Sequence, residues 1–107
     1  MNIKECRQAL LNNEILEYKT TVDVVFESSI TLMSRIVLFP VQIISIKLDE
    51  YNQTYIKVEM VEQSSISEKM QQQYKEAFEI RKQLGKRFFL SSLMGENVTT
   101  LQRRSNA

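Results

Sequence analysis

Hydrophobic and polar residues alternate most regularly between Leu16 and Phe26. Large or β-branched residues occupy every second position of this stretch: Leu16, Tyr18, Thr20, Val22, Val24 and Phe26. Charged residues such as Glu17 and Lys19 lie between them. A period of two is that of a β-strand with one buried and one solvated face. The pattern therefore predicts a strand here, with Glu17 and Lys19 on the face in water.

Further strands are predicted on the C-terminal side of Ser28 and Ser29. Two apolar runs, 30–39 and 41–48, are separated by Pro40. Proline has no N–H for the strand ladder, so we expect Pro40 at a bulge, an edge or a corner between two strands. After a polar connection over 49–54, the residues Ile56, Val58 and Met60 alternate again and predict another strand. Together these stretches predict an antiparallel sheet of three to five strands, open or closed into a small barrel.

A short helix and a long helix are predicted on either side of the strands. Apolar spacing indicates a first helix over Ile3–Leu11, ended by Asn12 and Asn13. Ser65 followed by Glu68 has the form of a capping box, which predicts the start of the second helix. The stripe that would cover the sheet is Met70, Tyr74, Ala77, Phe78, Arg81 and Leu84. This helix either breaks at Gly85 or continues through it to Gly95.

Length and composition fit one small domain. The chain has 107 residues, of which 43% are hydrophobic and 25% charged, as in an average globular protein. We expect an α+β fold with a short N-terminal helix, an antiparallel sheet and a long C-terminal helix packed on it. Residues 1–95 would form the domain, and residues 96–107 a basic and mobile tail.

The residue inventory argues against an enzyme. The chain has no histidine, one cysteine and two glycines, so a catalytic triad, a cysteine-rich zinc site and a glycine-rich phosphate loop are not expected. We expect no metal, no cofactor and no catalytic residue, and Cys6 should be a buried apolar residue. The N-terminus lacks the apolar region of a secretory signal, which leads us to expect a cytoplasmic protein. Residues 30–48 contain charged residues and strand-like alternation, so we expect no membrane span there.

Charge is distributed unevenly along the chain. Residues 1–80 contain eight Lys or Arg and twelve Asp or Glu, a net charge of −4, whereas residues 81–107 contain six and one, a net charge of +5. Basic residues beside Phe88 and Phe89 are typical of a site for single-stranded nucleic acid. The candidate residues are Arg81, Lys82, Lys86, Arg87, Arg103 and Arg104. Alternatively, basic residues near a helix C-terminus only complement its dipole.

The apolar residues near the end of the second helix suggest a protein interface. These are Phe88, Phe89, Leu90, Leu93 and Met94, a large number for one end of so small a domain. Small domains often complete their burial by oligomerising. The preferred hypothesis is a small non-enzymatic interaction or regulatory protein that self-associates and binds a protein partner. Nucleic-acid binding through residues 81–104 and an atypical small-ligand-binding domain are the alternatives.

Overall fold

The computed structural model describes residues 1–25, 32–85, 93–94 and 100–104 of the chain. Its elements are α1 (Ile3–Leu11), β1 (Leu16–Val25), β2 (Leu32–Leu48), β3 (Thr54–Met60), the 3-10 turn η1 (Gln63–Ser65), α2 (Glu68–Gln73), α3 (Lys75–Leu84), β4 (Leu93–Met94) and β5 (Leu101–Arg103). All paired strands run antiparallel, and the helices precede or follow the three main strands. The α+β class predicted from the sequence is therefore confirmed.

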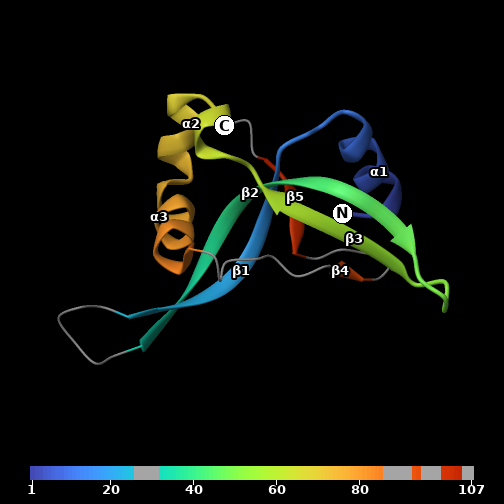
Figure 1. Cartoon of the computed structure of the whole chain (residues 1–107), viewed down its shortest axis with the longest axis horizontal. Helices are drawn as coiled ribbons and strands as arrows, with labels where there is room; N and C mark the ends of the chain where they lie inside the picture. The colour runs from blue at the N-terminus through green and yellow to red at the C-terminus, as the bar shows by residue number, and fades with distance from the viewer. Residues whose placement is uncertain (26–31, 86–92, 95–99, 105–107) are drawn as a thin grey trace.

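The strands form one sheet in the order β4-β3-β2-β1-β5, with β2 in the middle (Figure 1). The first part of β2 pairs with β1, from Leu32 opposite Val25 to Val41 opposite Leu16. The second part pairs with β3, from Val41 opposite Met60 to Leu48 opposite Thr54. β2 therefore belongs to two hairpins that overlap only at Val41. Among the described strands, β4 and β5 form the two edges, so the sheet is open.

Pro40 lies inside β2 and does not separate two strands, so the predicted division at this residue is wrong. The carbonyl of Pro40 accepts a hydrogen bond from Val61 N–H at 3.0 Å. In an extended residue the backbone nitrogen faces the same side as the carbonyl, so the Pro40 nitrogen also faces β3. The residue on that side is Val61, which follows the end of β3 at Met60. Its carbonyl accepts a hydrogen bond from the Arg81 side chain at 3.5 Å, so the absence of an N–H on Pro40 does not leave this carbonyl without a donor.

The predicted first helix is confirmed with its boundaries. The Asn2 side chain accepts a hydrogen bond from Glu5 N–H at 2.8 Å, and the Glu5 carboxylate accepts one from Asn2 N–H at 3.2 Å, which together make a capping box. The helix stops before Asn13, whose φ of 49° is left-handed and is tolerated by asparagine. Cys6 and Ala9 are buried, so Cys6 is the small apolar core residue that the sequence predicts.

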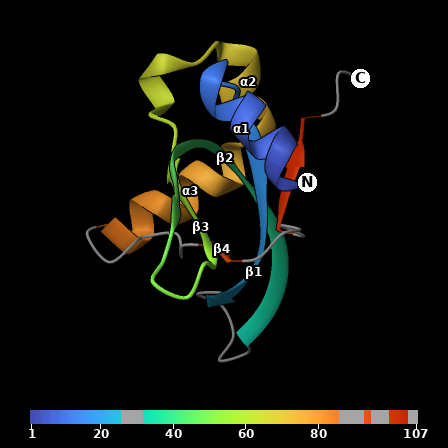
Figure 2. The same cartoon turned by 90° about the vertical axis from the view of Figure 1, so that its right-hand side faces the viewer.

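The two faces of the sheet differ in what covers them. Leu16, Phe39 and Val58 lie on one face by register, and all three are buried. Glu17 and its partner Pro40 lie on the other face. α3 packs there, because its residue Tyr74 at the N-cap donates to Glu17. Figure 2 shows α1 and α3 on opposite sides of the sheet.

The second helical region begins two residues later than predicted. The Ser67 hydroxyl accepts a hydrogen bond from Met70 N–H at 3.2 Å and caps α2. Ser65 belongs to η1, and its hydroxyl donates to the Glu62 carbonyl at 2.7 Å. The capping box predicted for Ser65 and Glu68 is therefore wrong, because Ser67 holds the position that a cap requires.

The region also forms two short helices, where the sequence predicts one long helix. Tyr74 departs from helical geometry with φ −110° and ψ 26°, and separates α2 from α3. Backbone hydrogen bonds continue on both sides, from Tyr74 N–H to Met70 and from Phe78 N–H to Tyr74, each at 3.1 Å. α3 then ends at Gly85, whose φ of 55° favours glycine. The helix does not continue through Gly85.

The C-terminal segment contributes strands. Leu93–Met94 form β4, which pairs with β3, and Leu101–Arg103 form β5, which pairs with β1. The segment expected to be a mobile tail therefore supplies one edge strand, and Leu101 is 2% exposed. The rest of that segment, 96–99 and 105–107, lies outside the described residues.

One cluster of contacting buried residues forms the core. Ile56, Val58, Met60, Tyr74 and Phe78 all belong to it, as their alternation and helical spacing predict. Val22 is partly buried and packs against this cluster, while Phe26 and the Val24 side chain lie outside the part of the chain that the structure describes. Among the described residues, no helix is long and apolar enough to cross a membrane.

Candidate partner-binding surface

Leu93 and Met94, two residues of the predicted apolar interface, lie beside the β2–β3 hairpin. Met94 pairs with Tyr55, and Leu93 with Ile56. The prediction that Leu93 and Met94 continue a helix is wrong, because they form β4. The other members of the predicted interface, Phe88, Phe89 and Leu90, lie outside the described residues. The pairing of β4 with β3 makes this end of the hairpin a candidate surface for partner binding.

Exposed apolar side chains are concentrated on the same hairpin. The described part of the chain has six large apolar residues that are exposed, and four of them lie in the stretch where β2 pairs with β3, or in the turn between the two strands: Ile44, Leu48, Tyr51 and Tyr55. We call these four residues the hairpin-end surface; by register Leu48 pairs with Thr54 and Tyr55 with Lys47, so the surface wraps around the end of the hairpin, with Leu48 and Tyr55 on opposite faces. Leu48 is 65% exposed and Tyr51 77%. Single exposed apolar residues are ordinary, whereas several on one element are typical of a contact site.

The turn that carries Tyr51 does not need its side chain. The Asp49 carboxylate accepts hydrogen bonds from the N–H groups of Tyr51 at 2.8 Å and Gln53 at 2.7 Å. Backbone bonds between Asp49 and Gln53 and between Asn52 and Asp49 close the turn, and Asn52 supplies its left-handed φ of 60°. The backbone thus holds the turn, and the Tyr51 ring is presented to solvent.

Ile44 lies at a β-bulge of β2. The pairing register of β2 with β3 shifts between Ile43 and Ser45. Ile43 is 6% exposed and Ile44 is 45% exposed. Neighbouring residues of a strand face opposite sides, so Ile44 is exposed where Ile43 is buried. The bulge leaves Ile44 without a partner residue on β3.

The charges around the hairpin-end surface are of both signs. Lys47 and Lys57 are exposed, and so are Glu50 and Glu59. With the Asp49 carboxylate of the turn, two positive and three negative side chains give this end of the hairpin a net charge of −1. Such a surface is poorly suited to a polyanion and well suited to another protein.

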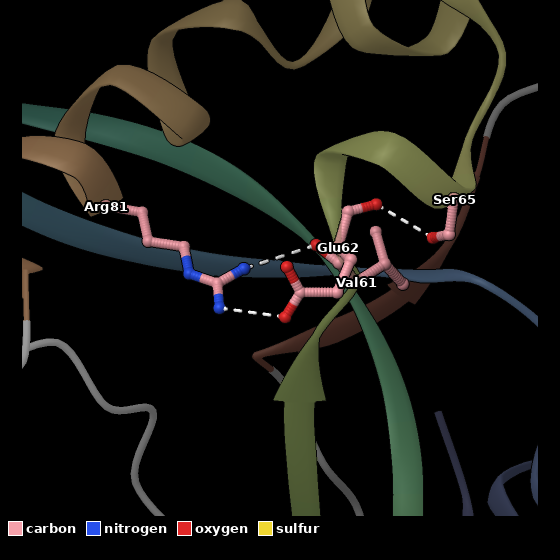
Figure 3. Close-up of polar contacts among 4 residues, drawn as sticks. All are labelled: Val61, Glu62, Ser65 and Arg81. Carbon is pink, nitrogen blue, oxygen red and sulfur yellow. Dashed lines mark hydrogen bonds and ion pairs between the residues drawn. The ribbon is translucent and has the colours of Figure 1, made fainter.

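Arg81, the first of the predicted nucleic-acid contacts, is engaged within the chain. Its guanidinium lies 3.2 Å from the Glu62 carboxylate and 3.5 Å from the Val61 carbonyl, as Figure 3 shows. Lys82 is exposed. Lys86 and Arg87 lie outside the described residues. The Arg81 contacts tie α3 to the segment that follows β3, which is a structural role.

The two arginines near the C-terminus are also held by intramolecular acceptors. Arg103 lies 3.6 Å from Glu14. Arg104 donates to the Tyr74 hydroxyl oxygen at 2.9 Å and to the Gln73 amide oxygen at 3.0 Å. Its guanidinium also lies 5.6 Å from the centre of the Tyr74 ring. These contacts give a nucleic-acid site less support than a structural role for the basic end.

A buried polar cluster lies between the sheet and α3. We call Glu17, Tyr74, Gln102 and Arg104 the Glu17 cluster. Glu17 is only 5% exposed, so the prediction that it lies in water is wrong. The Tyr74 hydroxyl donates to its carboxylate at 2.7 Å, and the Gln102 amide donates at 3.0 Å. Burial is possible because α3 covers this end of the polar face and supplies a donor.

The titratable groups that burial perturbs remain in their protonated form at neutral pH. Burial, followed by the hydrogen bond with Glu17, raises the pKa of Tyr74 above its ordinary value of 10.0. Burial raises the pKa of the Cys6 thiol, which makes a reactive thiolate less accessible. Among the described residues, no three His, Cys, Asp or Glu side chains gather where they would hold a metal ion.

Sequence reasoning missed the apolar residues of the β2–β3 turn and the buried carboxylate. The segment 49–54 is polar in composition, which hides Tyr51, although a tyrosine in a turn that asparagine and aspartate can form alone is a usable signal. Glu17 gives no such signal, because its place on the polar side of the alternation is that of an exposed residue.

Comparison of the chain with family models, curated proteins and solved structures finds no match.

Proposed function

We propose that the protein is a non-enzymatic interaction protein that self-associates through the hairpin-end surface. The observation that carries the proposal is the exposure of Leu48 and Tyr51 at one end of a well-ordered hairpin. The turn is held by its own backbone and by Asp49, so folding alone gives no reason for an apolar residue at either position. Burial against another protein gives one.

A second copy of the chain is the partner that the surface suits. The exposed lysines Lys47 and Lys57 and the exposed glutamates Glu50 and Glu59 border the apolar residues. Across a twofold axis the same patch meets itself, so charges of both signs can place each lysine near a glutamate of the other copy. Tyrosine is also enriched among the residues that contribute most to protein interfaces.

The test is the oligomeric state of a matched set of variants. The parent protein should dimerise at micromolar concentration in sedimentation equilibrium. The double variant Leu48→Ser/Tyr51→Ser should sediment as the monomer of 12.6 kDa. If each residue contributes about 2 kcal/mol, the dissociation constant rises roughly thirtyfold for each substitution.

Leu11→Ser is the control, because Leu11 is 82% exposed but lies at the end of α1. This variant should dimerise like the parent. A parent protein that stays monomeric at every concentration contradicts the proposal, and so does a double variant that dimerises as tightly as the parent.

A further inference from the structure

A hollow of about 250 Å³ lies between α3 and the polar face of β1 and β2. Ile36, Leu38 and Ala77 form its apolar wall, and Glu17, Tyr74 and Glu76 supply polar groups. The hollow is partly open to solvent, and its size suits a small organic molecule.

The carboxylate of Glu17 has neutral hydrogen-bond partners. Its donors are the Tyr74 hydroxyl at 2.7 Å and the Gln102 amide at 3.0 Å. The cation of the cluster, Arg104, donates to the Tyr74 oxygen and does not form an ion pair with Glu17 among the described contacts. A carboxylate has about four acceptor positions, of which these bonds fill two. A buried negative charge of this kind is stabilised by a further positively charged donor.

The wall beside the carboxylate favours an alkyl chain. Ile36 lines the hollow and is 64% exposed, although it lies in the central strand of the sheet. Leu38 is half-buried, and Ala77 is buried. A ligand with an apolar portion would cover the exposed part of Ile36 and gain the usual free energy of apolar burial.

The other charges at the hollow favour a cation over an anion. Glu76 belongs to the lining and forms an ion pair with Arg35 at 3.3 Å, so these two side chains compensate one another. Among the side chains that line the hollow, Glu17 then leaves an excess of negative charge; the Arg104 guanidinium, bonded to the same Tyr74 oxygen, lies outside the lining and offsets part of it. A carboxylate or phosphate ligand would be repelled at this end of the hollow.

We propose that this hollow binds a small primary alkylammonium ion, with the ammonium group at the Glu17 carboxylate and the alkyl chain on Ile36, Leu38 and Ala77. The site lies on α3, β1 and β2, away from the hairpin-end surface, and it adds a ligand to the proposed self-association. One ammonium hydrogen would donate to Glu17, and the remaining two would face Glu76 or water.

The probe for this site is butylammonium chloride, titrated into the full-length protein at constant ionic strength. In methyl NMR spectra the resonances of Ile36, Leu38 and Ala77 should shift and saturate at millimolar concentration. The neutral analogue 1-butanol has the same chain and should produce no saturable shift, because it lacks the charge. Equal binding of the two would overturn the proposal, since apolar contact would then account for all of it.

Two variants test the two parts of the site. Glu17→Gln should weaken butylammonium binding at least about tenfold, because a charge-assisted bond is lost. Ile36→Ala changes an exposed residue, so the fold is expected to survive, and binding should weaken severalfold. Glu68→Gln, at an exposed position of α2 outside both proposed sites, is the control and should bind like the parent. Unchanged affinity in Ile36→Ala, or in a folded Glu17→Gln, would overturn the proposal.

The two proposals can fail separately. The Leu48→Ser/Tyr51→Ser variant keeps every residue of the hollow and should bind butylammonium with the affinity of the parent. If it does so while remaining monomeric, the ligand site is independent of self-association. If it loses the ligand although it is folded, the location of the site between α3 and the sheet is wrong.

Discussion

Replacing Tyr74 with phenylalanine removes one oxygen atom from the centre of the Glu17 cluster and leaves the ring in place. That oxygen donates to Glu17 at 2.7 Å and accepts from Arg104 at 2.9 Å. The ring is 3% exposed, so apolar burial changes little. Hydrogen bonds to charged groups contribute about 1.5–3 kcal/mol each. Arg104 is only half-buried and can turn to water, which makes Glu17 the main source of the loss.

We therefore expect Tyr74→Phe to lower the free energy of unfolding by about 2–3 kcal/mol, equivalent to a fall in melting temperature of roughly 10 °C for a domain of this size. Urea unfolding at pH 7 and a fixed protein concentration measures this change in the free energy of unfolding. The control is Tyr51→Phe, whose side chain is exposed and should change stability by less than about 0.5 kcal/mol.

A double-mutant cycle with Glu17→Gln locates the effect. The two substitutions should be non-additive, with an interaction free energy of about 1 kcal/mol or more, because they remove the two ends of the same bond. If Tyr74→Phe costs no more than Tyr51→Phe, the hydroxyl does not stabilise the buried carboxylate and the reasoning fails.

Two other predictions concern the core and its response to alkali. Phe78→Ala should lower the free energy of unfolding by about 3 kcal/mol. This is the low end of the 3–5 kcal/mol typical for such a change, because Phe78 belongs to the core but also borders two surface hollows. If the melting temperature of this variant lies within a degree of that of the Glu79→Ala control, Phe78 lies outside the core. Stability should stay level up to about pH 8 and then decline, because the raised pKa values of Cys6, Tyr74 and Tyr18 mean that the unfolded chain loses these protons first, beginning with Cys6, whose ordinary pKa is 9.0. The urea concentration at half-unfolding, measured between pH 8 and 11, reports this decline. If that concentration increases between pH 10 and 11, the prediction is wrong.

The elements that the sequence predicts well are those with local causes. The capping box of Asn2 and Glu5 lies within four residues, and the alternation of β1 is uninterrupted, so both elements have the predicted start. The break at Tyr74 has no such signal, because the apolar spacing continues through it. Its side chain contacts Glu17, which is 57 positions away in the sequence. No local pattern contains that contact.

The candidate surface was predictable only in part. The apolar residues Leu93 and Met94 suggested an interface, and the structure places them next to Tyr55 and Ile56. Periodicity assigned them to a helix, since a two-residue edge strand has too few residues to show alternation. Ile44 was hidden because the run 41–48 is apolar at most positions, so the sequence does not show which of its residues face the core.

Pro40 also affects how the protein behaves toward other strands. Between Leu32 and Pro40, the only partner strand that the described residues show for β2 is β1. The edge of a strand can act as a template for intermolecular sheet growth. A strand of another molecule that docked beside β2 and extended toward Val41 would meet the proline nitrogen, which offers no donor. We therefore expect Pro40 to interrupt such growth beside the end of the chain's own β3.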